Sequence, residues 1–157
     1  MSAIETRLAA LGVKLPAAAA PVANYVPCTI SGNLLIVSGQ LAFVDGKLAP
    51  EHKGKLGAEV SDDSGRAAAR LCVINVLAQA KTALGGDLSR LERCLRLGGF
   101  INSEPDFKNL PQIMNGASDL IVEAMGEAGR HARSTIGVAQ LPMDCAVEVE
   151  AMFEIVP

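Results

Sequence analysis

The C-terminal stretch of the chain, residues 131 to 155, constrains the fold more than any other part. Residues 131–139 have β-forming character, and residues 141–144 (Leu-Pro-Met-Asp) are typical of a turn, because proline fixes φ and aspartate can bond its own backbone. Beyond the turn, apolar and polar residues alternate, which separates them onto the two faces of a strand. One face carries Val147, Val149, Ala151, Phe153 and Ile155, and the other carries Glu148, Glu150, Met152 and Glu154. The pattern predicts a two-stranded hairpin that brings Arg133 close to Glu148.

The upstream sequence predicts an α+β domain. We expect strands over residues 25–30, 33–41 and 91–101, turns at 31–33 and 44–47, and helices over 3–12, from about 61 to 84 and from about 110 to 125. The pair Gly98-Gly99 indicates a bulge in the third of these strands. The resulting order, β-β-(β)-α-β-α-β-β, predicts a two-layer mixed β-sheet with two helices on one face.

Chain length and hydropathy bear on domains and assembly. The 157 residues fit a single domain over residues 25–157, preceded by an N-terminal helix and linker over 1–24. Two helices cover only one sheet face, while Leu34 to Val37 is apolar on both and the apolar face of residues 147–153 adds to the surface that must leave water. The mean hydropathy of +0.30 is high for a monomer of this size. We therefore expect a closed homo-oligomer.

The composition argues against several classes of function. A net charge of −3, 3% aromatic residues and no cluster of lysine and arginine argue against nucleic-acid binding. No apolar run is long enough to span a membrane, and the charge order of the alanine-rich N-terminus is wrong for a signal peptide. Four widely spaced cysteines predict buried free thiols and a cytoplasmic protein. With two histidines, interpreted as loop and strand-end residues, we expect no metal site and no histidine-based triad.

The C-terminal stretch also resembles a known family. The segments Ala132-Arg133-Ser134, Leu141-Pro142 and Val147-Glu148-Val149-Glu150-Ala151 resemble the closing signature of the Rid proteins, the YjgF-like family also labelled L-PSP endoribonucleases. A tyrosine near the start, Ser38-Gly39-Gln40 and an asparagine at 115 follow the family order, so the resemblance covers roughly residues 20 to 156. It implies a chorismate mutase-like fold in which three domains pack their sheets into a trimeric barrel, with ligand clefts between subunits. The N-terminal helix, the loop at 51–60 and additional residues between Phe107 and Asn115 place the chain in a longer branch.

The resemblance implies roles for two charged residues. Arg133 would clamp a substrate carboxylate, since a guanidinium offers two parallel hydrogen bonds and stays charged when partly buried. Glu148 would orient the water or the proton used in the reaction. From the residues alone, Arg133 is equally a surface or structural arginine, and the glutamates around Glu148 are equally a solvated strand face.

Four further residues match the family site. Tyr25 would border the cleft, Gly39 would present its backbone N–H to the ligand, and Asn115 would line the cleft from the second long helix. Thr135 occupies a place often held by cysteine in the family, where its backbone would assist carboxylate binding. The alternatives are a packing role for Tyr25, a strand-end bend at Gly39 and a solvated helix face at Asn115.

The resemblance implies an enzyme that hydrolyses reactive enamines or imines derived from 2-amino acids, giving 2-keto acids and ammonia. Arg133 would hold the substrate and Glu148 would supply acid-base chemistry, and neither a cofactor nor a metal is expected. One alternative is a module that binds 2-keto acids or related carboxylates without turnover. Another is an endoribonuclease, for which the family label is the only support.

Overall fold

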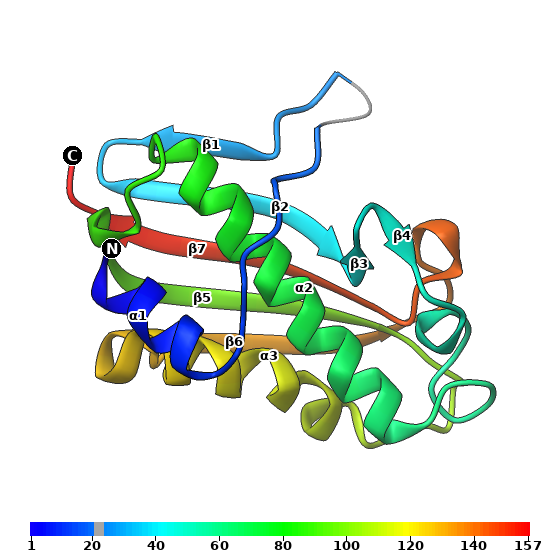
Figure 1. Cartoon of the computed structure of the whole chain (residues 1–157). Helices are drawn as coiled ribbons and strands as arrows, with labels where there is room; N and C mark the ends of the chain where they lie inside the picture. The colour runs from blue at the N-terminus through cyan, green and yellow to red at the C-terminus, as the bar shows by residue number, and fades with distance from the viewer. Residues whose placement is uncertain (21–23) are drawn as a thin grey trace.

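A computed structural model describes residues 1–20 and 24–157, which form a five-stranded sheet covered on one face by helices (Figure 1). The sheet order is β1-β2-β7-β5-β6, with β1 at Cys28–Ser31, β2 at Leu34–Leu41, β5 at Leu91–Asn102, β6 at Ala132–Val138 and β7 at Val147–Ile155. A separate small hairpin contains β3 (Phe43–Val44) and β4 (Lys47–Leu48). The α-helices are α1 (Ala3–Ala10), α2 (Asp62–Ala83) and α3 (Leu110–Met125), and short 3-10 helices are η1 (Pro50–His52), η2 (Leu88–Arg90), η3 (Gly126–Gly129) and η4 (Pro142–Asp144).

The sheet is mixed, as predicted. Strands β5 and β6 pair in parallel, whereas the β1–β2, β2–β7 and β5–β7 pairs are antiparallel. Helix α3 makes the crossover that parallel β5 and β6 require. The α+β two-layer prediction is therefore confirmed, with α2 and α3 on one face of the sheet (Figure 1).

The predicted C-terminal hairpin is wrong, because β5 lies between β6 and β7. Arg133 on β6 pairs with Leu97 of β5, and Glu148 on β7 pairs with Phe100. A crossover through α3 places β6 at the edge of the sheet. The connection from β6 to β7, which contains residues 141–144, therefore passes the end of β5 instead of closing a hairpin. The turn itself is confirmed as η4.

The apolar face of β7 is the covered face, which corrects the expectation that it stays bare. Its members are all buried beneath the helices: Val147, Val149, Ala151, Phe153 and Ile155. Helices pack on this face because burying it removes more apolar area from water than burying the glutamate-bearing face would. The open face carries the glutamates of β7 together with Ile36 and Ile136, which are 42% and 50% exposed.

The two long helices begin and end where the sequence predicts. The side chain of Ser61 accepts a hydrogen bond from the Ser64 backbone N–H and caps α2, while Gly85 and Gly86 follow its end with positive φ. Helix α3 has Pro111 in its first turn and buries its apolar stripe on the sheet.

The bulge predicted at Gly98-Gly99 is wrong. The register shifts of β5 lie nearer its start, between Leu91 and Arg93 and between Cys94 and Arg96. A Cβ atom on Gly98 would lie 2.6 Å from a carboxylate oxygen of Glu150. On the other sheet face, a Cβ atom on Gly99 would overlap the sulfur of Met114. The two glycines therefore make room for neighbouring side chains on both faces.

Helix α1 packs on the rest of the chain. A capping box between Ser2 and Glu5 starts it, Ile4 and Leu8 are buried, and Lys81 on α2 forms an ion pair with Glu5 at 2.7 Å. Residues 21–23 of the predicted linker lie outside the described residues, and the division of the chain at residue 24 stays a prediction.

The four cysteines are free thiols, as predicted. Three of them are buried, at positions 72, 94 and 145, and Cys28 is half-buried. Burial raises the pKa of the Cys28 thiol to about 11 and that of Cys94 to about 12, so these thiols are protonated at neutral pH. Across the described residues, helices long and apolar enough to cross a bilayer are absent.

Candidate functional site

Arg133 is held by α3 from the edge strand β6. Its Nη1 donates to the side-chain oxygen of Asn115 at 2.8 Å and to the hydroxyl of Ser118 at 3.1 Å, and its Nη2 donates to the carbonyl of Pro111 at 3.4 Å. Asn115 lies off the buried stripe of α3, so its amide is free to reach the guanidinium. The fold thus brings two of the predicted site residues, Arg133 and Asn115, into direct contact.

The contacts of Arg133 leave part of its guanidinium available. A guanidinium has five N–H groups, and three hydrogen bonds to the described residues use three of them. The two remaining N–H groups, one on Nε and one on Nη2, have no acceptor among the residues that the structure describes. Arginine recognises carboxylates by such paired donors, so the held side chain can bind an anion.

Sequence reasoning missed two members of this cluster, Ser118 and His131. The Ser118 hydroxyl lies 2.9 Å from Nε2 of His131, whose Nδ1 lies 2.6 Å from the carbonyl of Gly129. The interpretation of His131 as a mere strand-end residue overlooked this contact. The three-residue spacing of Asn115 and Ser118 on α3 is the signal that could have identified the serine, because such residues share a helix face.

Thr135 lies two residues after Arg133 and faces the same side of β6. Its hydroxyl oxygen is buried and has no hydrogen-bond partner among the described residues. A buried hydroxyl normally makes a hydrogen bond, so that of Thr135 can donate to or accept from a polar group of a ligand at this edge of the sheet.

The second cluster is formed by Gly39 and Glu148. Gly39 lies in the register shift of β2, between Val37 and Gln40. A Cβ atom at this glycine would overlap the carboxylate of Glu148 and lie 2.7 Å from its Cδ and 3.0 Å from its Cγ. Glycine at this position therefore lets the Glu148 side chain lie directly over the strand.

Burial raises the pKa of the Glu148 carboxyl above its usual value, and the charge of Glu150 adds to the effect. A carboxyl with a raised pKa exchanges protons nearer neutral pH than an ordinary glutamate. Glu148 is thereby suited to general acid-base chemistry.

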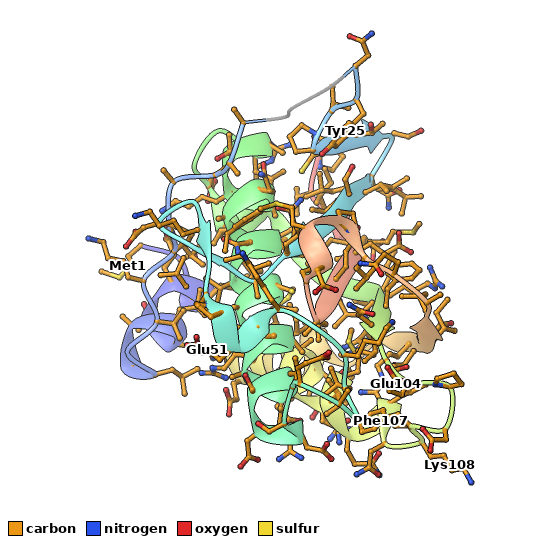
Figure 2. All side chains as sticks on the ribbon, turned by 90° about the vertical axis from the view of Figure 1, so that its right-hand side faces the viewer. Met1, Tyr25, Glu51, Glu104, Phe107 and Lys108 are labelled. Carbon is orange, nitrogen blue, oxygen red and sulfur yellow. The ribbon has the colours of Figure 1, made fainter. Side chains whose placement is uncertain are left out.

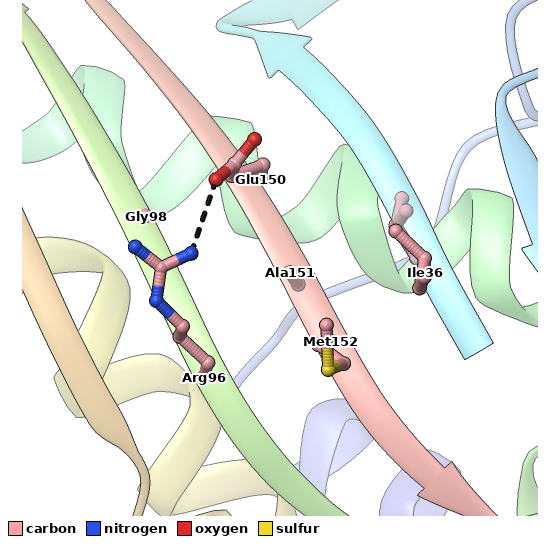
Figure 3. Close-up of a pocket in the computed structure, with 7 residues that line it drawn as sticks. Ile36, Arg96, Gly98, Glu150, Ala151 and Met152 are labelled. Atoms are coloured by element: carbon pink, nitrogen blue, oxygen red, sulfur yellow. Dashed lines mark hydrogen bonds and ion pairs between the residues drawn. The ribbon is translucent and has the colours of Figure 1, made fainter. Parts of the chain in front are cut away.

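Glu150, the next residue on the same face, has a structural partner. Arg96 forms an ion pair with it at 3.3 Å, beside a shallow pocket of about 70 Å³ that includes Ile36 and Met152 (Figure 3). Glu150 thus has a partner, whereas the side chain of Glu148 makes no hydrogen bond or ion pair with the described residues.

Tyr25 lies near Gly39. Together with Phe43 and Met143, the two residues line a pocket of about 230 Å³. The Tyr25 side chain is 53% exposed and lies at the β1 end of the molecule, whereas Phe107 and Lys108, which precede α3, lie at the opposite end (Figure 2).

The six predicted site residues therefore form two clusters in one chain. Arg133, Asn115 and Thr135 lie between β6 and α3, and Gly39, Glu148 and Tyr25 lie around β2 and β7. Two strand spacings of about 4.8 Å and a three-residue offset of about 3.3 Å per residue separate the Arg133 and Glu148 Cα atoms by about 14 Å. Their side chains also lie on opposite faces of the sheet, so the predicted approach of Arg133 to Glu148 within one chain is wrong.

Comparison with known proteins identifies the family. Residues 5–155 match the family model described as "YjgF/chorismate_mutase-like, putative endoribonuclease". The protein Atu1372 from Agrobacterium tumefaciens, whose function is unknown, has a crystal structure with a TM-score of 0.91 and 50% identity, covering 98% of this chain and 93% of its own. A "putative endoribonuclease" from Shewanella oneidensis has a TM-score of 0.92 and 39% identity, covering 97% of this chain and 99% of its own. Protein TCP17 of Trypanosoma cruzi is 48% identical over 153 residues, covering 97% of this chain and 94% of its own. The chain belongs to the YjgF/chorismate mutase-like family.

Proposed function

We propose that this protein hydrolyses reactive imines and enamines derived from 2-amino acids. The observation that carries the proposal is the guanidinium of Arg133, which Asn115 and Ser118 hold with two N–H groups left for a ligand. The 2-carboxylate of such an imine is planar and accepts two parallel hydrogen bonds, so it fits that pair of donors.

In the proposed reaction, Glu148 handles the proton. It takes one proton from a water molecule as the water oxygen bonds to the imine carbon, and it returns the proton to the nitrogen. This first transfer gives a carbinolamine. Glu148 then takes the proton of the new hydroxyl and gives it to the nitrogen as the C–N bond breaks, so that ammonia leaves and the carbonyl of the 2-keto acid forms. A raised pKa favours this role, because the carboxyl must both accept and donate a proton.

The proposed reaction needs no metal or organic cofactor, because the imine carbon is already electrophilic. The four free thiols fit a reducing compartment, and we assign the activity to the cytoplasm.

The proposed site needs a second copy of the chain. Since Arg133 and Glu148 lie about 14 Å apart and on opposite sheet faces, one chain cannot bring both to the same imine. The exposed apolar side chains of Ile36 and Ile136 on the open face favour association through that face. We propose a homotrimer, since threefold closure leaves no unpaired face, in which Arg133 of one copy and Glu148 of a neighbour share a cleft.

A coupled assay tests the proposed activity. A pyridoxal phosphate-dependent dehydratase generates the imine, and the purified protein should accelerate the release of ammonia. The variants Arg133→Ala and Glu148→Gln should lose this acceleration, whereas Glu150→Gln, which removes a neighbouring salt-bridged carboxylate, should retain it. Equal rates for the wild type and Arg133→Ala would contradict the proposal.

A carboxylate-binding module without turnover is the second candidate. The Arg133 cluster favours it, because that cluster is complete in one chain and does not need Glu148. Calorimetry with 2-ketobutyrate, pyruvate and benzoate separates the two candidates. Binding that depends on Arg133, without imine hydrolysis, would favour the module.

Endoribonuclease activity is supported by the family description and by the description of the Shewanella oneidensis relative. The net charge of −3 and the glutamates on the open face disfavour a path for phosphates, and 3% aromatic residues offer few surfaces on which bases can stack. RNA cleavage that survives both Arg133→Ala and removal of contaminating nucleases would favour this function.

A further inference from the structure

A chain of hydrogen bonds connects His131 to the proposed carboxylate clamp. Nδ1 of His131 lies 2.6 Å from the carbonyl oxygen of Gly129, Nε2 lies 2.9 Å from the hydroxyl of Ser118, and that hydroxyl accepts a bond from Nη1 of Arg133 at 3.1 Å. Each member contacts the next directly. The imidazole is thus one hydroxyl away from the guanidinium.

The chemistry of these partners determines the tautomer of the neutral ring. A carbonyl oxygen can only accept, so Nδ1 carries the hydrogen and donates it to Gly129. Nε2 then holds the lone pair and accepts the hydrogen of the Ser118 hydroxyl. The lone pairs of the Ser118 oxygen are left to accept from Nη1 of Arg133. Each of the three hydrogen bonds that link Gly129 to Arg133 then has one donor and one acceptor.

Protonation of the ring reverses one of these bonds. Nε2 becomes a donor, so the Ser118 oxygen must accept from His131 and Arg133 together, and its own hydrogen loses its acceptor. Two positive charges then lie on either side of one hydroxyl and repel each other. The contact between Ser118 and Arg133 is the one that weakens, because Asn115 and Pro111 offer the guanidinium other acceptors.

The other charged groups near His131 leave this effect in place. On η3 and its flank, Glu127 pairs with Arg130, and on α3, Glu123 pairs with Arg70. The remaining charged side chain on the nearby part of α3 is Asp119, which is exposed to solvent. On β5, Arg96 is the register partner of Ala132, and it pairs with Glu150 on the opposite sheet face. On α1, Arg7 lies at the start of η3, where its Nη1 donates to the carbonyl of Ala124 at 3.5 Å.

We propose that His131 is a positioning residue that orients Arg133 through Ser118, and that protonation of its imidazole weakens carboxylate binding. The inference rests on the proposed function insofar as the ligand of Arg133 is a carboxylate. The positioning itself is a property of the free protein.

The first experiment needs no ligand. Nitrogen-15 NMR of the two histidine side chains reports the tautomer, with His52 as the internal reference. At pH 8, His131 should carry its hydrogen on Nδ1, and the Nη–H groups of Arg133, one of which donates to Ser118, should exchange with solvent faster once His131 is protonated. In Ser118→Ala that exchange should be fast at every pH. A hydrogen on Nε2 of neutral His131 would overturn the inference. An Arg133 exchange rate that changes neither on protonation of His131 nor in Ser118→Ala would also overturn it.

The second experiment measures the affinity for 2-ketobutyrate between pH 5.5 and 8, with Glu148→Gln present in every protein compared, so that the carboxyl proposed to share the cleft cannot contribute a pH step. The protein that keeps His131 should lose about tenfold in affinity when the imidazole is protonated, a factor that corresponds to about 1.4 kcal/mol. His131→Gln should bind with constant affinity, since the neutral amide still accepts from Ser118, whereas the control His52→Gln should keep the pH step. A pH step that persists in His131→Gln would overturn the inference. Absence of binding at any pH would instead contradict the proposed function, and the NMR experiment would still decide the role of His131.

Discussion

Replacing Gly39 with alanine should inactivate the proposed enzyme without unfolding it. The added Cβ atom would overlap the carboxylate of Glu148 and approach its Cδ to 2.7 Å, so the glutamate must rotate away. Gly39 has no positive φ, and alanine fits its backbone. The backbone N–H that the family resemblance assigns to ligand binding is also preserved.

Two small contributions to stability nearly cancel in this variant. Forcing Glu148 off its rotamer destabilises the folded protein by about 0.5–1.5 kcal/mol. Alanine also lowers the conformational entropy of the unfolded chain, which stabilises the folded protein by about 0.4–1 kcal/mol. The free energy of unfolding should therefore change by less than about 1 kcal/mol. Misplacing a general acid-base group lowers rates by about 10²- to 10⁴-fold, so the rate of ammonia release should fall by at least about 100-fold.

Urea unfolding and the coupled ammonia assay measure the two effects. Gly98→Ala is the matched control, because its Cβ atom would lie 2.6 Å from a carboxylate oxygen of Glu150 and displace that side chain instead. Gly98→Ala breaks only the exposed ion pair between Arg96 and Glu150, which contributes up to about 1 kcal/mol to stability. Its rate of ammonia release should stay within about threefold of the wild-type rate. Full activity of Gly39→Ala, or an equal loss in Gly98→Ala, would refute the role of Glu148.

Three further substitutions test the fold. The pKa of Glu5 is about 2 because Lys81 and the Ser2 cap bind the carboxylate. Its stabilising effect is therefore present above the ordinary pKa of 4.5 and disappears as the pH falls toward 2, so Glu5→Gln should flatten urea stability across that interval; an unchanged pH slope would refute the link. Gly116→Ala would drive a Cβ atom into the carbonyl of Arg66 where α2 and α3 touch, and calorimetry should show a loss of about 1–3 kcal/mol. Asn102→Ala removes a fully buried acceptor that binds a lysine ammonium at 2.7 Å, and it should cost about 1–3 kcal/mol in urea unfolding. Wild-type stability in either variant would contradict the contact concerned.

Local signals in the sequence predicted the elements well. Ser61 and Gly85-Gly86 delimit α2 because caps and left-handed glycines act over a few residues. The type of sheet followed from the order of the elements. Asn115 could be placed off the buried stripe of α3 by helical period alone.

Strand order and the direction of side chains could not be predicted in the same way. Nothing local in residues 131–138 distinguishes a hairpin partner of β7 from an edge strand that pairs in parallel with β5. That choice depends on the crossover through α3, and it separates Arg133 from Glu148. The contact between Ser118 and His131 escaped notice because it joins α3 to the residue before β6, thirteen positions later in the chain.

The central claim, that Arg133 and Glu148 act on one substrate from different copies of the chain, is tested most directly by mixing two inactive variants. Arg133→Ala and Glu148→Gln should each lack ammonia release, and unfolding and refolding them together at equal amounts forms mixed trimers. With random assembly, about one cleft in four should combine an intact arginine with an intact glutamate, restoring about a quarter of wild-type activity. Light scattering should give a mass near three times the 16.3 kDa of the chain for the mixture and for each variant. A trimer that regains no activity on mixing would contradict the shared site, and a monomer would contradict the assembly on which it depends.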